Sequence, residues 1–159
     1  MPASAAVPGL DTIDRSILRA LQRDGRLTNV QLARQIGLSP SPCLRRVKSL
    51  EERGYISGYA AQLDPARLGR GLQVVVMVSL VDQRQETLAA FEKAVLALDD
   101  VTRCALVAGD ADYLLTVNVR DLDSYHRVYT GRLGELPGVV SMRSLVTMKS
   151  VKDTRSLPV

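Results

Sequence analysis

Apolar residues in the first third of the chain recur every three or four positions, the spacing of helices that bury one face. Three such stretches occur, each with a polar capping residue before it and a glycine after it. The caps are Asp11, Thr28 and Ser41, and the glycines are Gly25, Gly37 and Gly54. The expected buried stripes are Ile13, Ile17, Leu18 and Leu21, then Val30, Leu32, Ala33 and Ile36, then Leu44, Val47 and Leu50. The pattern predicts a small three-helix domain.

From residue 72 onward the periodicity alternates between that of strands and that of helices. The expected strands are 72–81, 101–107, 113–119 and 139–151, and the expected helices are 85–98 and 122–133. The order βαββαβ predicts a ferredoxin-like α+β domain, with an antiparallel four-stranded sheet and both helices on one face. Because the strand 72–81 is apolar on both sides, we expect a second copy to bury the uncovered face, giving at least an obligate homodimer.

A short extended stretch that ends at Asp64-Pro65 separates the two patterns and predicts a linker strand followed by a turn. We therefore expect three parts. The helical domain covers residues 1–54, with residues 1–9 as a mobile arm, the linker covers 55–70, and the ferredoxin-like domain covers 71–159.

The second and third helices, joined by a tight turn, are typical of a helix-turn-helix that reads DNA. Cationic side chains lie between the apolar positions of the third helix, and a helix N-terminus attracts phosphate through its free N–H groups. The DNA-contacting residues that we predict are Arg26, Ser39, Ser41, Pro42, Arg45, Arg46 and Lys48. A plain helical hairpin with a solvated basic face is the alternative.

The positive charge of the chain lies entirely in this first part. Residues 1–60 hold nine Lys and Arg side chains against five Asp and Glu, whereas the remaining residues hold twelve of each. The net charge of +4 therefore belongs to the helical domain, which is the end of the chain expected to bind a polyanion.

Composition narrows the class of protein further. With 159 residues and 46% apolar content, the chain is expected to be a soluble globular protein. The longest apolar run, 74–81, is too short to cross a bilayer, and the N-terminus lacks the pattern of an export signal, so we expect a cytoplasmic protein at the nucleoid that binds no membrane. Cys43 and Cys104 are expected to be reduced core residues and His126 a helix-surface residue, so neither a metal site nor a catalytic triad is predicted.

The whole chain resembles the Lrp/AsnC, or feast/famine, transcriptional regulators. The motifs that carry the resemblance are Leu10-Asp11-x-x-Asp14-x-x-Ile17-Leu18, Gly37-Leu38-Ser39-Pro40-Ser41-Pro42-Cys43-Leu44, Leu50-Glu51-x-x-Gly54 and Gly109-Asp110-x-Asp112-Tyr113-Leu114. Such regulators look like a helix-turn-helix joined to a ferredoxin-like effector-sensing domain, and they form dimers that often associate into octamers. The resemblance places the DNA element on Ser39 to Arg53.

The resemblance also implies an effector site for a free amino acid or related metabolite, bound where dimers meet. It maps this site onto the loop 107–112 and a facing strand. The effector residues are Gly109, Asp110, Asp112, Leu122, Leu145, Val146 and Thr147. Loop N–H groups would hold the carboxylate, an aspartate the ammonium, and the leucines and valine the aliphatic side chain. The same Gly-Asp pattern is also that of an ordinary turn.

The predicted function is a sequence-specific transcriptional regulator without cofactor, binding double-stranded DNA and an amino acid effector and assembling from homodimers, with an octamer as the expected form. An architectural nucleoid protein without effector is the first alternative. An acylphosphatase-type enzyme would use Asn118 and Arg120, but no phosphate-cradling glycine loop precedes a helix. We therefore predict no enzyme activity.

Overall fold

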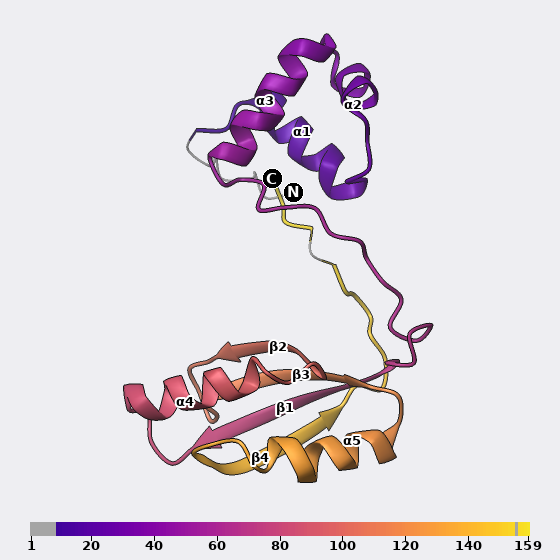
Figure 1. The fold of residues 1–159 in the computed structure, drawn as a ribbon. Helices are drawn as coiled ribbons and strands as arrows, with labels where there is room; N and C mark the ends of the chain where they lie inside the picture. Colours follow the sequence, from indigo (N-terminus) through magenta and orange to yellow (C-terminus); the bar gives the residue numbers. More distant parts are fainter. Residues whose placement is uncertain (1–8, 155) are drawn as a thin grey trace. The chain divides into compact units, whose positions relative to one another are not determined.

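The computed structural model describes residues 9–154 and 156–159 of the chain, which divide into two compact units. The first is Met1–Gln62 together with Lys152–Val159, and the second is Leu63–Val151. Figure 1 shows a helical unit and a unit built on a sheet. Most of the expected arm, residues 1–8, lies outside the described residues. In the described part of the chain, no helix is long and apolar enough to pass through a lipid bilayer.

The first unit contains the three expected helices. They are α1 (Thr12–Arg23), α2 (Asn29–Ile36) and α3 (Pro40–Glu52). Asp11 and Thr28 cap the first two as predicted, and Gly37 ends α2 in the left-handed conformation, at φ 74°. The shared core contains the buried residues Ile17, Leu18, Ala20, Leu32, Ala33, Cys43 and Leu50. Burial raises the pKa of the Cys43 thiol, so it stays protonated.

Three details of the helical prediction were wrong. The cap of α3 is Ser39, with Pro40 in the first turn, and not Ser41. The Ser-Pro pair occurs twice in succession, and both prolines fit because the first N–H groups of a helix have no intrahelical partner. Leu44 and Val30 are 44% and 64% exposed, and Cys43 takes the predicted core place of Leu44. Helix α1 ends with Asp24 as its cap, one residue before Gly25.

The chain between the units forms no strand, contrary to the prediction. Residues 57–64 pair with no described strand, and Asp64 instead caps a turn by accepting from the N–H of Ala66 at 3.0 Å. Tyr59 folds back onto α3, where its hydroxyl donates to Glu51 at 3.0 Å. Burial and this carboxylate raise the pKa of Tyr59 to about 12.

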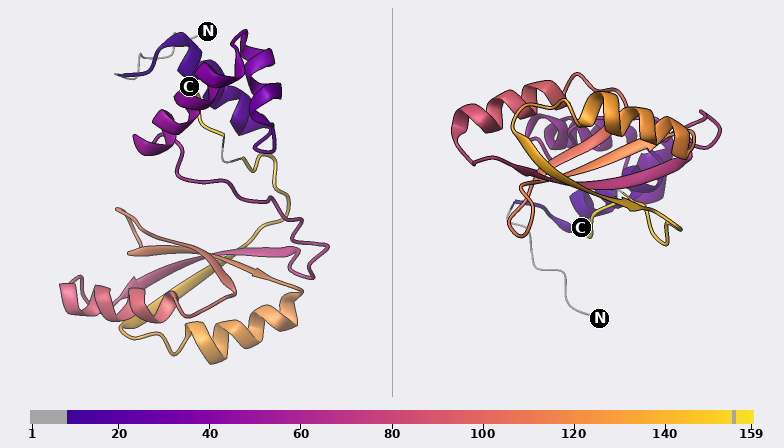
Figure 2. Two further views of the ribbon diagram at one scale, coloured as in Figure 1. Left: turned by 45° about the horizontal axis from the view of Figure 1, so that its top comes forward. Right: turned by 90° about the horizontal axis from the view of Figure 1, so that it is seen from below.

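The second unit has the predicted βαββαβ order. Its elements are β1 (Leu72–Leu80), α4 (Gln85–Val95), β2 (Val101–Leu106), β3 (Tyr113–Val119), α5 (Leu122–Val128), a π-helical turn η1 (Tyr129–Leu133) and β4 (Val139–Val146). The antiparallel strands lie in the order β2-β3-β1-β4. Figure 2 shows α4 and α5 on one side of this sheet, as expected for a ferredoxin-like domain.

The sheet has one buried face and one open face. Val74, Val76 and Val78 of β1 are fully buried in the core beneath the two helices. Residues of alternate register point to the other face, where no described element of the second unit covers them. The apolar side chains of this open face are Val75, Met77, Ala105, Leu114 and Leu145.

Several predicted elements of the second unit end early. The expected strand 139–151 stops at Val146, which pairs with Val74, and only one further backbone hydrogen bond follows, from Thr147 to Gln73 at 3.0 Å. The expected helix 122–133 changes after Val128 into a π-helical turn, in which the N–H of Gly134 donates to Tyr129 five residues earlier, at 2.9 Å. Cys104 is exposed, not in the core, because β2 is an edge strand.

Candidate DNA interface and effector site

The turn between α2 and α3 is fixed by hydrogen bonds. The N–H of Leu38 donates to the carbonyl of Ala33 at 2.9 Å, and the side-chain amide of Asn29 donates to the carbonyl of Pro40 at 2.8 Å. Leu32 and Ala33 are buried where α2 meets its neighbours. The N-terminal half of α3 is therefore held rigidly on α2, as a helix that enters a DNA groove must be.

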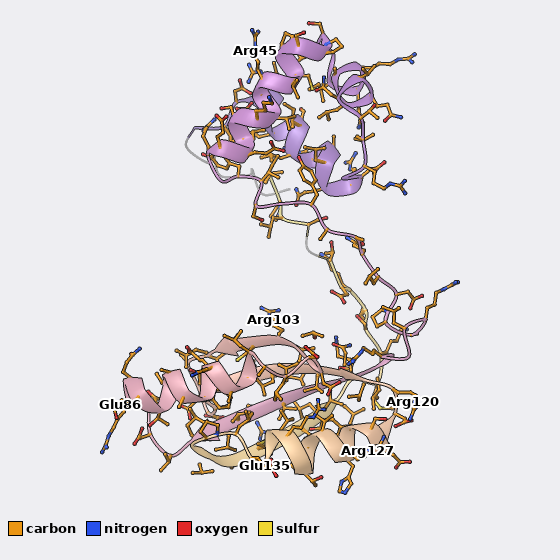
Figure 3. The ribbon with its side chains drawn as sticks, viewed as in Figure 1. Arg45, Glu86, Arg103, Arg120, Arg127 and Glu135 are labelled. Atoms are coloured by element: carbon orange, nitrogen blue, oxygen red, sulfur yellow. The ribbon has the colours of Figure 1, made fainter. Side chains whose placement is uncertain are left out.

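Three of the predicted DNA-contacting residues share one face of α3. Ser41, Arg45 and Lys48 are separated by four and three positions, so they project from the same side of the helix, and all three are exposed. Among the described residues, neither Arg45 nor Lys48 has a carboxylate partner. Figure 3 shows Arg45 projecting outward from α3. This face is a compact cationic surface, which we call the α3 face.

Arg46 is engaged elsewhere. Its Nη1 donates to Asp11 at 2.7 Å and to Asp14 at 2.8 Å, so it ties α3 to the first turn of α1. The two carboxylates raise the pKa of Arg46, and the Asp14 side chain is only 10% exposed. No local pattern indicates this pairing, because Arg46 lies more than thirty positions from either aspartate and the aspartates also suit a helix start. Arg46 therefore has a structural role that the prediction missed.

The other predicted DNA residues lie at the margins of this surface. Ser39 is the exposed cap of α3, and Pro42 is half-buried in its first turn. Arg26 follows α1, in the connection to α2, where its N–H donates to the Asp24 carboxylate at 2.9 Å. It is exposed and does not belong to α3.

The loop 107–112 joins β2 to β3 and contains the predicted Gly-Asp motif. Gly109 has φ 144°, a backbone conformation that favours glycine, and a Cβ there would meet no atom within 4 Å. The loop is closed by two backbone hydrogen bonds, from Val107 to Asp112 and from Asp112 to Val78, both at 2.9 Å. The loop tip, Ala108 to Asp110, is exposed.

The two aspartates of this loop have different surroundings. One carboxylate oxygen of Asp112 accepts from the N–H of Leu80 and the other from the side chain of Gln83, each at 2.7 Å. Both carboxylate oxygens of Asp112 therefore accept hydrogen bonds at and just after the end of β1. The side chain of Asp110 is exposed and makes no hydrogen bond or ion pair with any described residue. Asp110 is the loop carboxylate that remains available to an ammonium group.

The remaining predicted effector residues lie at the opposite end of the sheet. Thr147 bonds to Gln73 at the start of β1, whereas the Gly109 loop bonds to Val78 five residues later. Five strand residues span about 17 Å, which is longer than a free amino acid. Leu122, 61% exposed, follows β3 at the same end as Thr147. One chain therefore does not bring these two groups of residues together.

The predicted apolar wall is also divided. Leu145 pairs with Val75 on the open face, and Val146 pairs with Val74 on the face that carries the helices. Both are partly exposed, at 49% and 42%. Neighbouring strand residues point to opposite faces, so a single ligand contacts both only around the edge of β4. In the described part of the chain, no three His, Cys, Asp or Glu side chains are grouped to hold a metal ion.

Comparison with known proteins agrees with both units. A winged helix-turn-helix DNA-binding model matches residues 10–57, and a model of the Lrp/AsnC ligand binding domain matches residues 73–157. The chain is 44% identical to the leucine-responsive regulatory protein of Escherichia coli K12 over 148 residues, covering 93% of this chain and 90% of that protein.

Solved structures give the same result. A Neisseria meningitidis transcriptional regulator in complex with L-methionine has a TM-score of 0.90 and 38% identity, covering 94% of this chain and 96% of that one. An AsnC family regulator of Agrobacterium tumefaciens has a TM-score of 0.89 and 34% identity, covering 94% and 97%. The chain therefore belongs to the Lrp/AsnC family and is a DNA-binding transcriptional regulator with a ligand-binding domain, not an enzyme.

Proposed function

We propose that the α3 face contacts DNA and that Arg46, on another side of the helix, holds α3 in position. Arg45 and Lys48 contact phosphates and guanine edges, while Ser39, Ser41 and the start of α3 set the register on the duplex. The observation that carries the assignment is the exposed cationic row on a helix clamped to α2. Arg46 acts through the ion pairs that fix α3 on α1.

The regulator works as an assembly of copies. The open face presents a row of apolar side chains that a partner's identical face can bury, which makes it the surface for a homodimer. Two recognition helices in one dimer match a site of two related half-sites. Dimers associate further, up to an octamer, through the ends of the sheet that hold the effector residues.

The effector is a free amino acid with an aliphatic side chain. Loop N–H groups around Gly109 and the free carboxylate of Asp110 suit the two charges of a zwitterion. Leu122, Leu145, Val146 and Thr147 are too distant to reach the same molecule within one chain, so a second copy supplies them. Two relatives support this ligand class. The Escherichia coli relative is named for its response to leucine, and the Neisseria meningitidis regulator was solved in complex with L-methionine.

The test combines DNA binding with assembly state. DNA recovered after crosslinking defines the preferred duplex, and competition with unrelated duplex then measures sequence choice. Light scattering with L-leucine or L-methionine should show a change in the size of the assembly that Asp110→Ala abolishes and Asp99→Ala, a change of another exposed aspartate, preserves.

Two outcomes would contradict this function. Equal affinity for every duplex, with no response to any amino acid up to millimolar concentration, would favour an architectural nucleoid protein. A ligand response that survives Asp110→Ala would remove the aspartate from the site while leaving the regulator function intact.

A further inference from the structure

A cavity of about 460 Å³ lies in the second unit and is lined by none of the effector residues described above, although Leu122 stands in the chain between its lining residues Arg120 and Ser124. It is open to solvent on one side, and its walls come from the turn before β1, Asp100 just before β2, the end of β3, α5 and η1. Its volume falls within the range of small-molecule sites, about 300–1,000 Å³. The residues that carry its charge are Arg70, Asp100, Arg120, Arg127 and Arg132.

Two of the four arginines are held in place by one carboxylate. Arg70 donates to one oxygen of Asp100 at 2.7 Å, and Arg132 donates to the other at 2.9 Å. Arg70 also donates to the carbonyl of Asn118 at 3.1 Å. The Asp100 side chain is 16% exposed, while the two arginine side chains are about half exposed, at 44% and 55%. Their remaining N–H groups are therefore free to meet a ligand in fixed positions.

The other two arginines are Arg120, which directly follows β3, and Arg127 of α5. Arg120 pairs with the exposed Asp121 at 2.9 Å, and Arg127 donates to the hydroxyl of Ser124 at 3.0 Å. Among the described residues, Arg127 has no carboxylate partner. Figure 3 shows both side chains at the same end of the unit. Counting Asp100 and Asp121, the cavity keeps a surplus of two positive charges.

The chemistry of this cavity differs from that of an amino acid site. A zwitterion needs an acceptor for its ammonium group, but the single described lining carboxylate, Asp100, is already paired with two arginines whose charges exceed its own. Guanidinium groups match phosphate oxygens with paired hydrogen bonds. Two pairs of arginines suit two phosphate groups of one ligand: Arg70 and Arg132 are fixed by Asp100, and Arg120 and Arg127 come from the end of β3 and from α5.

We propose that this cavity binds a small anion that carries two or more phosphate groups, such as a nucleoside polyphosphate, as a second ligand of the regulator. The site is for binding and not for hydrolysis. Asn118, the residue that an acylphosphatase-type enzyme would need, accepts a hydrogen bond from Thr102 at 2.7 Å and does not line the cavity. The inference is independent of the proposed amino acid site, because the two share no residue.

The test uses calorimetry on the full chain with inorganic pyrophosphate as the probe. The wild-type protein should bind one pyrophosphate per chain, and Arg120→Gln with Arg127→Gln should weaken binding at least about tenfold. Arg127→Lys alone should lose less affinity than Arg127→Gln alone, because it keeps the charge and loses only the paired geometry. Arg84→Gln with Lys93→Gln, the same charge change on exposed residues of the α4 region, should leave the affinity unchanged.

Each other result overturns the proposal. Absence of pyrophosphate binding, or an equal loss of affinity in the cavity and control variants, would show that the arginines are ordinary solvent-exposed side chains. Loss of L-leucine or L-methionine binding in the cavity variant, with pyrophosphate binding intact, would assign the cavity to the amino acid. A variant that loses affinity for duplex DNA and keeps pyrophosphate affinity would make these arginines contacts to the DNA backbone.

Discussion

The two units place their functional residues in opposite ways. In the first, the α3 face lies on one helix, and its residues are brought together by helical spacing alone. In the second, the effector residues come from a loop, a helix start and a strand, at opposite ends of one sheet. A surface built on one element is complete in each copy, whereas a dispersed set of residues needs another copy. The proposed DNA contact is therefore complete in each copy, whereas the proposed effector site depends on assembly.

The largest expected effect is on assembly. Val75→Asp would place a carboxylate at the centre of the open face, and an unpaired charge buried in an interface costs several kcal/mol. Multi-angle light scattering should then report single chains. The same change at the 86% exposed Leu96, on the far end of α4, should leave the wild-type mass unchanged. A Val75→Asp protein that stays oligomeric would exclude the open face as the interface.

The second effect is on DNA affinity. Arg45→Gln with Lys48→Gln should weaken binding roughly tenfold to a hundredfold and reduce the slope of log affinity against log salt by about two. Fluorescence anisotropy at several salt concentrations measures both quantities. The thermal midpoint should not change, because neither side chain pairs with a described carboxylate. Arg84→Gln with Lys93→Gln serves as the charge-matched control, and an equal loss in that variant would contradict a local α3 contact.

A smaller effect separates Arg46 from its neighbour. Arg46→Ala leaves the mostly buried Asp14 without its cationic partner, so it should destabilise the first unit by about 1 kcal/mol, a value reduced by the partial exposure of Arg46. Urea unfolding followed by circular dichroism measures the change. Arg45→Ala should leave the stability unchanged. If Arg46→Ala keeps full stability and loses sequence choice, Arg46 reads a base directly.

The smallest effect concerns the two aspartates that cap helices, Asp11 in the first unit and Asp121 in the second. Hydrogen bonds from Ser124 and Arg120 hold the pKa of Asp121 at about 2, and the N–H of Asp14 with Arg46 lowers the pKa of Asp11. Because both pKa values are lowered on folding, the stabilisation is present above the ordinary value of 3.8 and is lost as pH falls through the folded values.

Carboxyl NMR titration should give a midpoint of about 2 for Asp121. Asp121→Asn keeps a good cap, so its deficit in stability relative to wild type should be present at pH 5 and shrink towards pH 2. An Asp121 midpoint close to 3.8 would show that the cap carries no charge-dependent stabilisation. The same measurement on Asp11 tests whether local capping behaves alike in the two units.

Details that depend on neighbours were the ones predicted wrongly. Cys43 and Leu44 are adjacent and both apolar, and only the position of α1 and α2 decides that Cys43 is buried while Leu44 is 44% exposed. The expected strand 139–151 has suitable residues to its end, but its pairing with β1 stops at Val146. The C-terminal residues join the helical unit, with Val159 accepting from Arg19 at 2.6 Å across 140 positions, which no local pattern indicates.

The amino-acid sequence by itself determined the order of helices and strands, the start of every helix except α3, the face of α3 that carries charge and the βαββαβ topology. These follow from periodicity and caps, which act over a few residues. Only the tertiary structure decided that Arg46 binds Asp11 and Asp14, that Asp112 is committed while Asp110 is free, and that four arginines share a cavity. Contacts between distant positions depend on how elements pack, and packing is a property of the whole fold.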